Sequence, residues 1–335
     1  MNKILFIGSF LSKTQGTHGI SEKLSKTLIS NGLCVRLSSK KKNKFLRFFE
    51  IVVVTLFSRY KKIHIDVFSG PAFKIAEIAS FLAQYRSKHI ILTLRGGKLP
   101  EFSRDNRERI IKVFERASLI TTPSLYLANF FEDLGLNIAY LPNSIKTDKF
   151  PFREDQVLNN KILWVRAFDS IYCPQVAIEA LKMIKKEFPN ATLTMVGPDK
   201  GKLASIIDLI NKYHLTDSVD ILGPIANYDL KKYYNSHQVF FNTTAYESFG
   251  NCILEAASCG TSIITNTVGE IPYLWKHEVN ALLVKNNDPE LFANYTIRLF
   301  RNPNVSEQLR SAARKRSKEF EEKLIISKWL DIFND

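Results

Sequence analysis

Several motifs that would identify a common type of site are missing from this 335-residue sequence. Its four cysteines form no Cys-x-x-C pair, so neither a thiolate metal site nor a redox motif is indicated, and core thiols are the simplest interpretation. Its six histidines form no ligand pattern. No Asp-x-Asp occurs, so no carboxylate pair for a divalent ion is visible, and we expect no bound metal.

Long apolar runs are also missing. The longest unbroken run near Ile51–Val54 is far shorter than the roughly 20 residues that a membrane span needs. The first residues read as a buried strand that ends at Gly8, too short for a signal peptide and without a small-residue cleavage site. We therefore expect a cytoplasmic protein, soluble or peripheral on a membrane. Its net charge of +14 favours polyanionic partners: nucleic acid, an anionic membrane or phosphorylated substrates.

Short apolar runs alternate with longer amphipathic segments along the chain. The expected strands of the first half are Ile4–Ile7, Cys34–Leu37, Ile63–Phe68, His89–Leu94, Leu119–Thr122 and Ile138–Leu141. Those of the second half are Ile162–Val165, Ala191–Val196, Val219–Leu222, Val239–Asn242, Ser262–Thr265 and Ala281–Val284. Helical patterns lie between them, such as Glu22–Ile29, Arg107–Ala117, Gln175–Phe188 and Asp229–Asn235. This repeated alternation predicts an α/β protein with two doubly wound, Rossmann-like domains.

A turn at Leu141–Ser144 separates the two halves. We expect an N-terminal domain over residues 1–150, a C-terminal domain over 151–318, and a C-terminal helix in 319–335 that packs back on the first domain. Two such domains facing each other would leave a cleft lined by the carboxyl ends of their strands, where ligands of such sheets bind.

The stretch Glu247–Gly260 carries the most information about chemistry. It follows the expected strand Val239–Asn242 and opens a helix, so that Phe249–Asn251 would lie at the helix N-terminus, where free backbone N–H groups favour an anion. Two carboxylates, Glu247 and Glu255, would repel a phosphate. They make sense if each binds hydroxyls, one on a sugar and one on a ribose. The alternative is a pair of solvated acids on a helix surface.

This stretch resembles the C-terminal signature of glycosyltransferase family four, retaining enzymes of the GT-B fold. The signature is a Glu, seven residues and a second Glu, with Phe-Gly after the first and Ala after the second, and all of these are present. Similarity continues through Val268–Pro272, Asn280–Val284 and Asn143–Ile145. The resemblance is strong from about Lys161 to Val284 and weaker in the residues that precede Lys161.

The resemblance implies a metal-independent hexosyltransferase that moves a sugar from a nucleoside-diphosphate sugar to an acceptor hydroxyl. The acceptor would be a saccharide or lipid-linked saccharide, in the synthesis of cell-surface polysaccharide or a lipid-linked glycan. The donor is a co-substrate, and no separate cofactor is implied.

By the same resemblance Arg166 binds the diphosphate, Glu247 positions the donor sugar without covalent attack, and Glu255 binds the ribose. The implied catalytic residues are Glu247 and Arg166. The implied donor-binding residues are Gly197, Lys200, Ile225, Phe249, Gly250, Asn251 and Glu255. The implied acceptor-side residues are Gly16, Thr17, His18 and Arg95.

The sequence departs from the family in two places. The family's Arg is followed five residues on by a Lys that neutralises the diphosphate, and here Ile171 stands five residues after Arg166. Lys200 is the nearest candidate for a substitute, with a solvated loop lysine as the alternative. Where the family often has His-Gly, this chain has Arg95, which suggests an altered donor or a charge that faces phosphate.

Two other classes of protein are alternatives to this interpretation. The missing Lys leaves open a catalytically silent GT-B protein that acts as partner of another glycosyltransferase. A nicotinamide-dependent oxidoreductase is disfavoured, because no Gly-x-Gly-x-x-Gly follows the first strand.

A basic and aromatic cluster lies near the end of the first sixth of the chain. Its basic residues are Lys40, Lys41, Lys42, Lys44 and Arg47, and its aromatic residues are Phe45, Phe48 and Phe49. Such a cluster can lie on an anionic membrane surface. A core helix with basic flanks is the alternative. Nucleic acid is not an expected partner, because no nucleic-acid-binding motif occurs.

Overall fold

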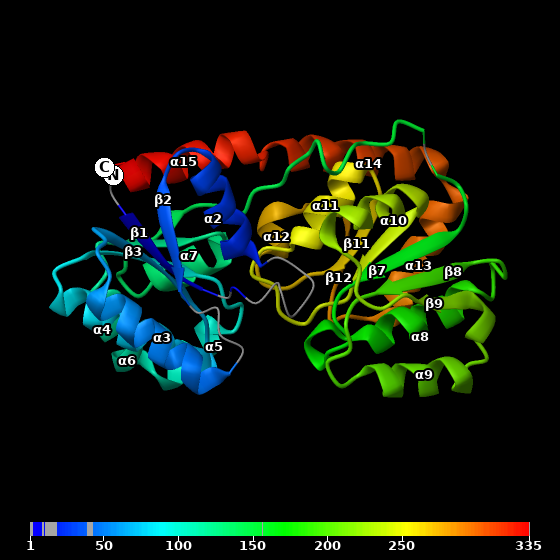
Figure 1. Cartoon of the computed structure of the whole chain (residues 1–335). Helices are drawn as coiled ribbons and strands as arrows, with labels where there is room; N and C mark the ends of the chain where they lie inside the picture. The colour runs from blue at the N-terminus through cyan, green and yellow to red at the C-terminus, as the bar shows by residue number, and fades with distance from the viewer. Residues whose placement is uncertain (1–2, 9, 11–18, 39–42, 156, 335) are drawn as a thin grey trace. The chain divides into compact units, whose positions relative to one another are not determined.

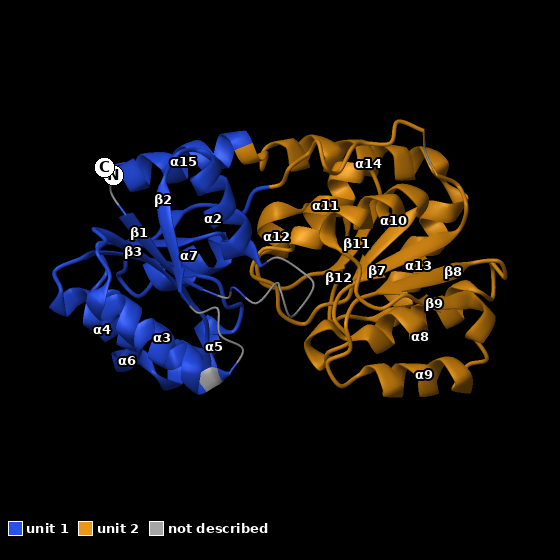
Figure 2. Cartoon of the chain, viewed as in Figure 1, with its two compact units in different colours: residues 1–144, 323–335 blue, residues 145–322 orange. Residues whose placement is uncertain are grey.

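The computed structural model divides the chain into two compact units (Figure 2). Unit 1 comprises residues 1–144 and 323–335, and unit 2 comprises residues 145–322. The structure describes residues 3–8, 10, 19–38, 43–155 and 157–334. Gly16, Thr17, His18 and Lys40–Lys42, which the sequence singled out, lie outside the described residues.

Unit 1 contains a parallel six-stranded sheet in the order β2-β1-β3-β4-β5-β6 (Figure 1). The strands are β1 (Lys3–Ile7), β2 (Cys34–Ser38), β3 (Lys62–Val67), β4 (His89–Leu94), β5 (Leu119–Thr122) and β6 (Ala139–Tyr140). The helices are α2 (Ile20–Ser30), α3 (Lys44–Phe57), α4 (Phe73–Tyr85), α5 (Leu99–Asp105), α6 (Arg107–Phe114), α7 (Leu125–Glu132) and α15 (Glu322–Asn334).

The two faces of this sheet carry different helices, as the alternation of side chains along β1 requires. Leu5 and Ile7 join the apolar cluster formed with α4, α6 and α7. Ile4 and Phe6 join a second cluster with α2 and α15, in which Trp329 and Phe333 of α15 are buried. The last helix of the chain therefore covers a face of the first strand.

Unit 2 contains a second parallel six-stranded sheet, in the order β12-β11-β10-β7-β8-β9. The strands are β7 (Lys161–Val165), β8 (Thr192–Val196), β9 (Val219–Ile221), β10 (Val239–Asn242), β11 (Ser262–Asn266) and β12 (Leu282–Val284). The helices are α8 (Pro174–Ile184), α9 (Leu203–Lys212), α10 (Lys231–Ser236), α11 (Asn251–Cys259), α12 (Ile271–Leu274), α13 (Pro289–Arg301) and α14 (Pro303–Lys318).

The predicted fold class, two Rossmann-like parallel sheets with helices, is confirmed, and each of the twelve expected strands is present. Strand order reverses between β1 and β3 in unit 1 and between β7 and β10 in unit 2. At such a reversal the loops leave neighbouring strands toward opposite faces, which opens a crevice at the carboxyl edge of the sheet. These two edges are where functional side chains are expected.

His64 is a fully buried imidazole in the middle of β3. Its ring stacks on Phe6 with 4.3 Å between ring centroids, and its Nε2 lies 2.7 Å from the Thr93 hydroxyl. Burial lowers the pKa of His64 to about 4, although the nearby Asp66 charge raises it. The ring is therefore neutral at pH 7.

Lowering the pH from 7 to 5 should destabilise unit 1. The unfolded chain binds a proton on His64 below its ordinary pKa of 6.5, whereas the folded unit excludes that proton until about pH 4. Each unit of pKa difference is equivalent to about 1.4 kcal/mol of unfolding free energy. Calorimetric melting temperatures at pH 7, 6 and 5 should fall less steeply for His64→Gln than for the wild type. Equal slopes for the two proteins would show that His64 does not contribute.

Candidate functional site

Arg166 lies at the carboxyl edge of the unit 2 sheet, just after β7. Because Trp164 of β7 pairs with Phe241 of β10, the residues that follow these two lie side by side at the strand reversal. The Nε and Nη2 atoms of Arg166 donate hydrogen bonds to Oδ1 of Asn242, at 3.2 and 3.0 Å. Nη2 also forms an ion pair with Glu247, whose side chain is only 12% exposed. Two residues 81 positions apart thus form one charge pair.

Asn242 connects this pair to the sheet. Its Nδ2 donates to the Thr265 hydroxyl of β11 at 2.9 Å, which leaves Oδ1 directed to Arg166. Sequence reasoning missed Asn242 as a site residue. The signal was there, since a polar amide that ends an otherwise apolar buried strand needs a hydrogen-bonding partner.

The loop that carries Glu247 is held by backbone contacts. Glu247 Oε1 accepts hydrogen bonds from the backbone N–H groups of Ser248 and Phe249, at 3.2 and 3.3 Å. The Glu247 carbonyl accepts one from the backbone of Glu270 at 3.1 Å. Gly269 makes this approach possible: its φ is +54°, and a Cβ there would lie 2.0 Å from the Glu247 carbonyl oxygen. The glycine of Val268–Pro272 therefore sets the position of Glu247.

Phe249, Gly250 and Asn251 lie at the start of α11, as the sequence predicts. Gly250 is the N-cap residue, with φ +89°, and Asn251 is the first helical residue. The Phe249 ring is buried and contacts Phe320, with 5.6 Å between ring centroids. Phe249 can therefore meet a ligand only through its backbone. Gly260 ends the helix in the left-handed conformation that the sequence indicated.

Glu255 is a buried carboxylate, 7% exposed, on the same helix. Its Oε1 accepts a hydrogen bond from Nδ2 of Asn227 at 2.8 Å, and its Oε2 accepts one from the Tyr234 hydroxyl at 3.2 Å. Burial raises the pKa of Tyr234 well above its ordinary value, so the phenol remains a donor. Glu255 is therefore not a solvated acid on the helix surface, which was the alternative interpretation of the sequence.

The remaining expected donor-side residues lie on loops around this edge. A Cβ at Gly197 would fall 1.8 Å from the Arg166 carbonyl oxygen, so the glycine is required by the neighbouring backbone itself. Lys200 is exposed, and its backbone N–H donates to the Phe168 carbonyl at 3.0 Å. Its ammonium group forms no ion pair within the described part of the chain. Ile225 is half-buried against the core that contains Phe249.

In unit 1, Arg95 lies at the corresponding edge, after β4. Its Nε is 2.5 Å from Oδ1 of Asp66, a fully buried carboxylate that also accepts a hydrogen bond from the Ser21 hydroxyl. Its Nη1 is 3.3 Å from Oδ1 of Asn143. The structure thus pairs the Arg95 charge inside unit 1. Sequence reasoning missed Asp66, although a lone carboxylate in an apolar strand was visible.

A cavity of about 270 Å³ opens beside this ion pair in unit 1. Most of its described lining is apolar, and Arg47 of α3 is the one cation among these described residues. The lining residues are Ile7, Gly8, Arg47, Asp66, Phe68, Ala72 and Ile75.

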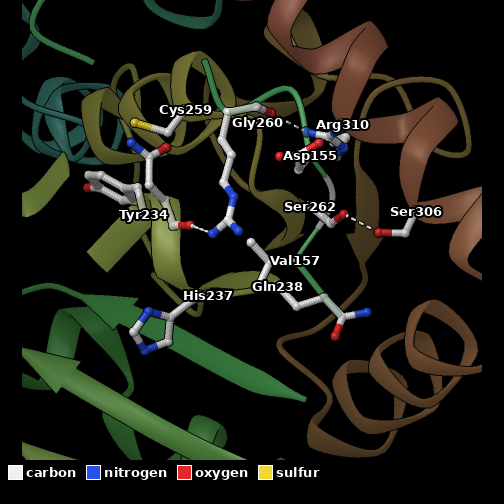
Figure 3. Close-up of a pocket in the computed structure, with 12 residues that line it drawn as sticks. Asp155, Val157, Tyr234, His237, Gln238, Cys259, Gly260, Ser262, Ser306 and Arg310 are labelled. Atoms are coloured by element: carbon white, nitrogen blue, oxygen red, sulfur yellow. Dashed lines mark hydrogen bonds between the residues drawn. The ribbon is translucent and has the colours of Figure 1, made fainter. Parts of the chain in front are cut away.

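A second cavity, shown in Figure 3, lies at the opposite, amino edge of the unit 2 sheet. Its volume is only about 10 Å³, which is room for one water molecule at most. Arg310 donates to the Arg153 carbonyl at 2.7 Å there, and the Ser262 and Ser306 hydroxyls lie 2.7 Å apart. These bonds attach α14 to the sheet, so the cavity is structural and no substrate site.

Comparison with known proteins agrees with the class that this geometry defines. Over 100% of both chains, the structure is similar to that of Anabaena HepE in complex with UDP and glucose, with a TM-score of 0.79 and 18% identity. It is also similar to sucrose-phosphate synthase from Thermosynechococcus elongatus, with a TM-score of 0.81 and 18% identity over 100% of this chain and 98% of that one. The fold is that of the two-sheet GT-B glycosyltransferases.

The family follows from the sequence comparison. Residues 147–316 match the family described as "Glycosyl transferases group 1", and the chain belongs to this family. A D-inositol 3-phosphate glycosyltransferase of Saccharomonospora viridis is 29% identical over 170 residues, which cover 48% of this chain and 39% of that protein. The chain spans about two fifths of the length of the curated relatives that it matches.

The role of Gly269 can be tested by alanine. Gly269→Ala should lower the melting temperature of unit 2 and displace Glu247, because the new Cβ clashes with the Glu247 carbonyl in addition to the strain of positive φ, which costs about 1–3 kcal/mol. Gly223→Ala is the matched control: its φ is +65°, and nothing lies within 4 Å of its Cβ. Equal losses of stability in the two variants would contradict the close approach.

Proposed function

We propose that this chain transfers a sugar from a nucleoside-diphosphate sugar to an acceptor hydroxyl, with retention of the anomeric configuration. The observation that carries the proposal is the contact between Arg166 and Glu247 at the strand reversal of unit 2. A leaving diphosphate develops negative charge, and a preorganised guanidinium stabilises that charge. The neighbouring Glu247 is an acceptor that can orient the hydroxyls of the donor sugar.

The nucleoside half of the donor is assigned to Glu255. Its two oxygens are already oriented by Asn227 and Tyr234, and an ionised carboxylate has further lone pairs that can accept two ribose hydroxyls. Asn227 lies two residues after Ile225, whose backbone is proposed to meet the base. Lys200 remains the proposed source of additional positive charge at the diphosphate.

The acceptor is proposed to be a saccharide or lipid-linked saccharide that unit 1 binds. The largely apolar cavity of about 270 Å³, with Arg47 in its lining, supports such an acceptor-side site, near Arg95. One relative is named a D-inositol 3-phosphate glycosyltransferase, and the structure of Anabaena HepE is a complex with UDP and glucose, which supports a sugar-nucleotide donor for this chain. No observation favours a catalytically silent partner protein, since the Arg166–Glu247 pair is intact.

Separate effects on binding and turnover test these roles. Glu255→Ala should weaken binding of the nucleoside diphosphate by about 1.5–3 kcal/mol, the value of a charge-assisted hydrogen bond. Glu247→Ala should lower turnover more than nucleotide affinity, because its partner is the sugar. Binding is measured by calorimetry and turnover by release of nucleoside diphosphate. Glu290→Ala, an exposed carboxylate on α13, is the control and should change neither quantity.

Two results would contradict these assignments. Wild-type turnover in Glu247→Ala would remove Glu247 from the reaction. Unchanged nucleotide affinity in Glu255→Ala would remove Glu255 from the ribose site.

We also propose that unit 1 docks on an anionic membrane through α3. Six apolar side chains of this helix are exposed, with exposed fractions from 40% for Val53 to 87% for Phe45. The exposed members, here called the α3 face, are Phe45, Leu46, Phe48, Phe49, Val53 and Phe57. Toward the core the helix buries Ile51 and Thr55. A core helix would not leave so much apolar area in solvent.

Further exposed apolar and basic groups lie on α4 and on α3 itself. Helix α3 packs beside α4, whose Phe81 and Tyr85 are 56% and 80% exposed (Figure 1). Arg47 and the exposed Lys74 supply positive charge, and an excess of basic residues gives the chain its charge of +14. Each cation near an anionic lipid surface contributes about 1 kcal/mol. Within the described residues no helix is long and apolar enough to cross a bilayer.

Co-sedimentation with vesicles tests the docking. The wild type should bind phosphatidylserine-containing vesicles at low salt and release them at high salt, because the attraction is partly ionic. Phe49→Gln with Phe57→Gln should lose most of this binding without a change in melting temperature. The control Ile207→Gln alters an apolar residue of unit 2 that is 43% exposed, and this variant should bind as the wild type does. If the wild-type protein does not co-sediment with anionic vesicles at low salt, the proposed docking is wrong.

A further inference from the structure

The short turn before α8 is tied to the loop that leads to Glu247. This turn, η2 (Ser170–Tyr172), is capped by the Asp169 side chain. The Ile171 carbonyl accepts a hydrogen bond from the backbone of Ala245 at 2.8 Å. The Tyr172 carbonyl accepts one from the Thr243 hydroxyl at 2.7 Å. The backbone of Tyr172 is thus fixed against the end of β10.

The Tyr172 ring lies against the guanidinium of Arg166, with 5.3 Å between the guanidinium carbon and the ring centroid. This contact is a cation–π interaction, which restricts the plane of the guanidinium. The chain turns away directly afterwards, because Cys173 has φ +45° and Pro174 begins α8. Tyr172 is therefore the last residue of the turn whose side chain remains at the Arg166 site.

The hydrogen bonds of Arg166 leave one end of the guanidinium open. Nε and Nη2 donate to Asn242, and Nη2 also contacts Glu247. Nη1 makes no hydrogen bond with any residue that the structure describes. Two N–H groups of a held cation are thus available to an oxyanion.

The Tyr172 hydroxyl is available in the same way. It forms no hydrogen bond to the described residues, and the side chain is only half-buried. Burial raises the pKa of Tyr172, whereas the Arg166 charge lowers it by less. At neutral pH the hydroxyl therefore keeps its proton and is a hydrogen-bond donor.

We propose that Tyr172 is a donor-binding residue, whose ring orients Arg166 and whose hydroxyl donates a hydrogen bond to the diphosphate of the nucleotide sugar. This inference rests on the proposed role of Arg166 at the diphosphate. Ile171, five residues after Arg166, brings no donor to this site, and Lys200 is exposed on the adjacent loop. Tyr172 supplies a neutral donor on a ring that contacts the Arg166 guanidinium.

The hydroxyl is tested by Tyr172→Phe, which keeps the ring. Calorimetry first determines whether the wild type binds UDP or GDP. The affinity for that diphosphate is then compared with the affinity for its nucleoside, uridine or guanosine. Tyr172→Phe should weaken diphosphate binding about tenfold, the effect of one lost hydrogen bond to a charged group, and leave nucleoside binding unchanged. Tyr172→Leu should weaken it further and also lower turnover, because Arg166 loses the ring. The control Tyr213→Phe removes the hydroxyl of another tyrosine that contacts a cation, Lys182.

The outcomes separate this inference from the proposed function. Wild-type diphosphate affinity in Tyr172→Phe would overturn the hydroxyl contact. An equal loss for nucleoside and diphosphate would show a merely structural role and also overturn it. Arg166→Ala provides the reference: if it leaves diphosphate binding unchanged, or if the wild type binds neither diphosphate, the proposed donor site itself fails. If Arg166→Ala weakens diphosphate binding and Tyr172→Phe does not, the proposed donor site is supported and the proposed role of Tyr172 is wrong.

Discussion

The ion pair between Arg166 and Glu247 is the interaction on which the carboxyl edge of unit 2 depends. Both side chains are nearly enclosed, at 15% and 12% exposure, so neither charge could remain there alone. Leaving one member of a buried pair unpaired costs about 3–5 kcal/mol. Asn242 and Gly269, on opposite sides of the pair, hold its two members in contact. The site is therefore organised by the folded chain before any ligand binds.

The pairing also determines how an anion can be recognised. Because Glu247 compensates the charge of Arg166, this edge offers a diphosphate little net positive charge. In the proposed donor site, recognition therefore relies mainly on directed hydrogen-bond donors: the open nitrogen of Arg166, the phenol of Tyr172 and the backbone at the start of α11, with Lys200 as the proposed additional charge. Directed donors distinguish a phosphate in the correct position from one that is merely nearby, and this favours specificity over raw affinity.

The sequence could predict the features that local patterns determine. Strand alternation predicted the two sheets, and Glu247–Gly260 predicted a turn, a helix start at Gly250 and a helix end at Gly260. Asn242 and Asp66 could be recognised as polar residues in apolar strands, but their partners could not be assigned, because these lie 76 and 29 residues away across the edge of a sheet. Tyr172 could not be assigned, because its ring contacts Arg166 only once the turn between them is folded.

Two residues were also interpreted without the neighbours that explain them. Gly197 was expected among the donor-binding residues, and the structure adds that the Arg166 carbonyl occupies the space where its Cβ would be. Arg95 was expected to reflect an altered donor or to face phosphate, and the structure adds its ion pair with Asp66. In both cases the added partner is distant in the chain, where neither spacing nor residue type identifies it.

The position of α15 has a consequence for how the chain folds as it is synthesised. Unit 2 is continuous in sequence, whereas the core of unit 1 includes Trp329 and Phe333, which are translated after all of unit 2. The chain is synthesised at about 5–20 residues per second, and domains fold as units during synthesis. Unit 2 can therefore form while one face of the first sheet is still uncovered. On that face Phe6 of β1 and His64 of β3 then remain uncovered until α15 has been synthesised and can pack against them. A chaperone that shields exposed apolar surface would have its longest opportunity at this face.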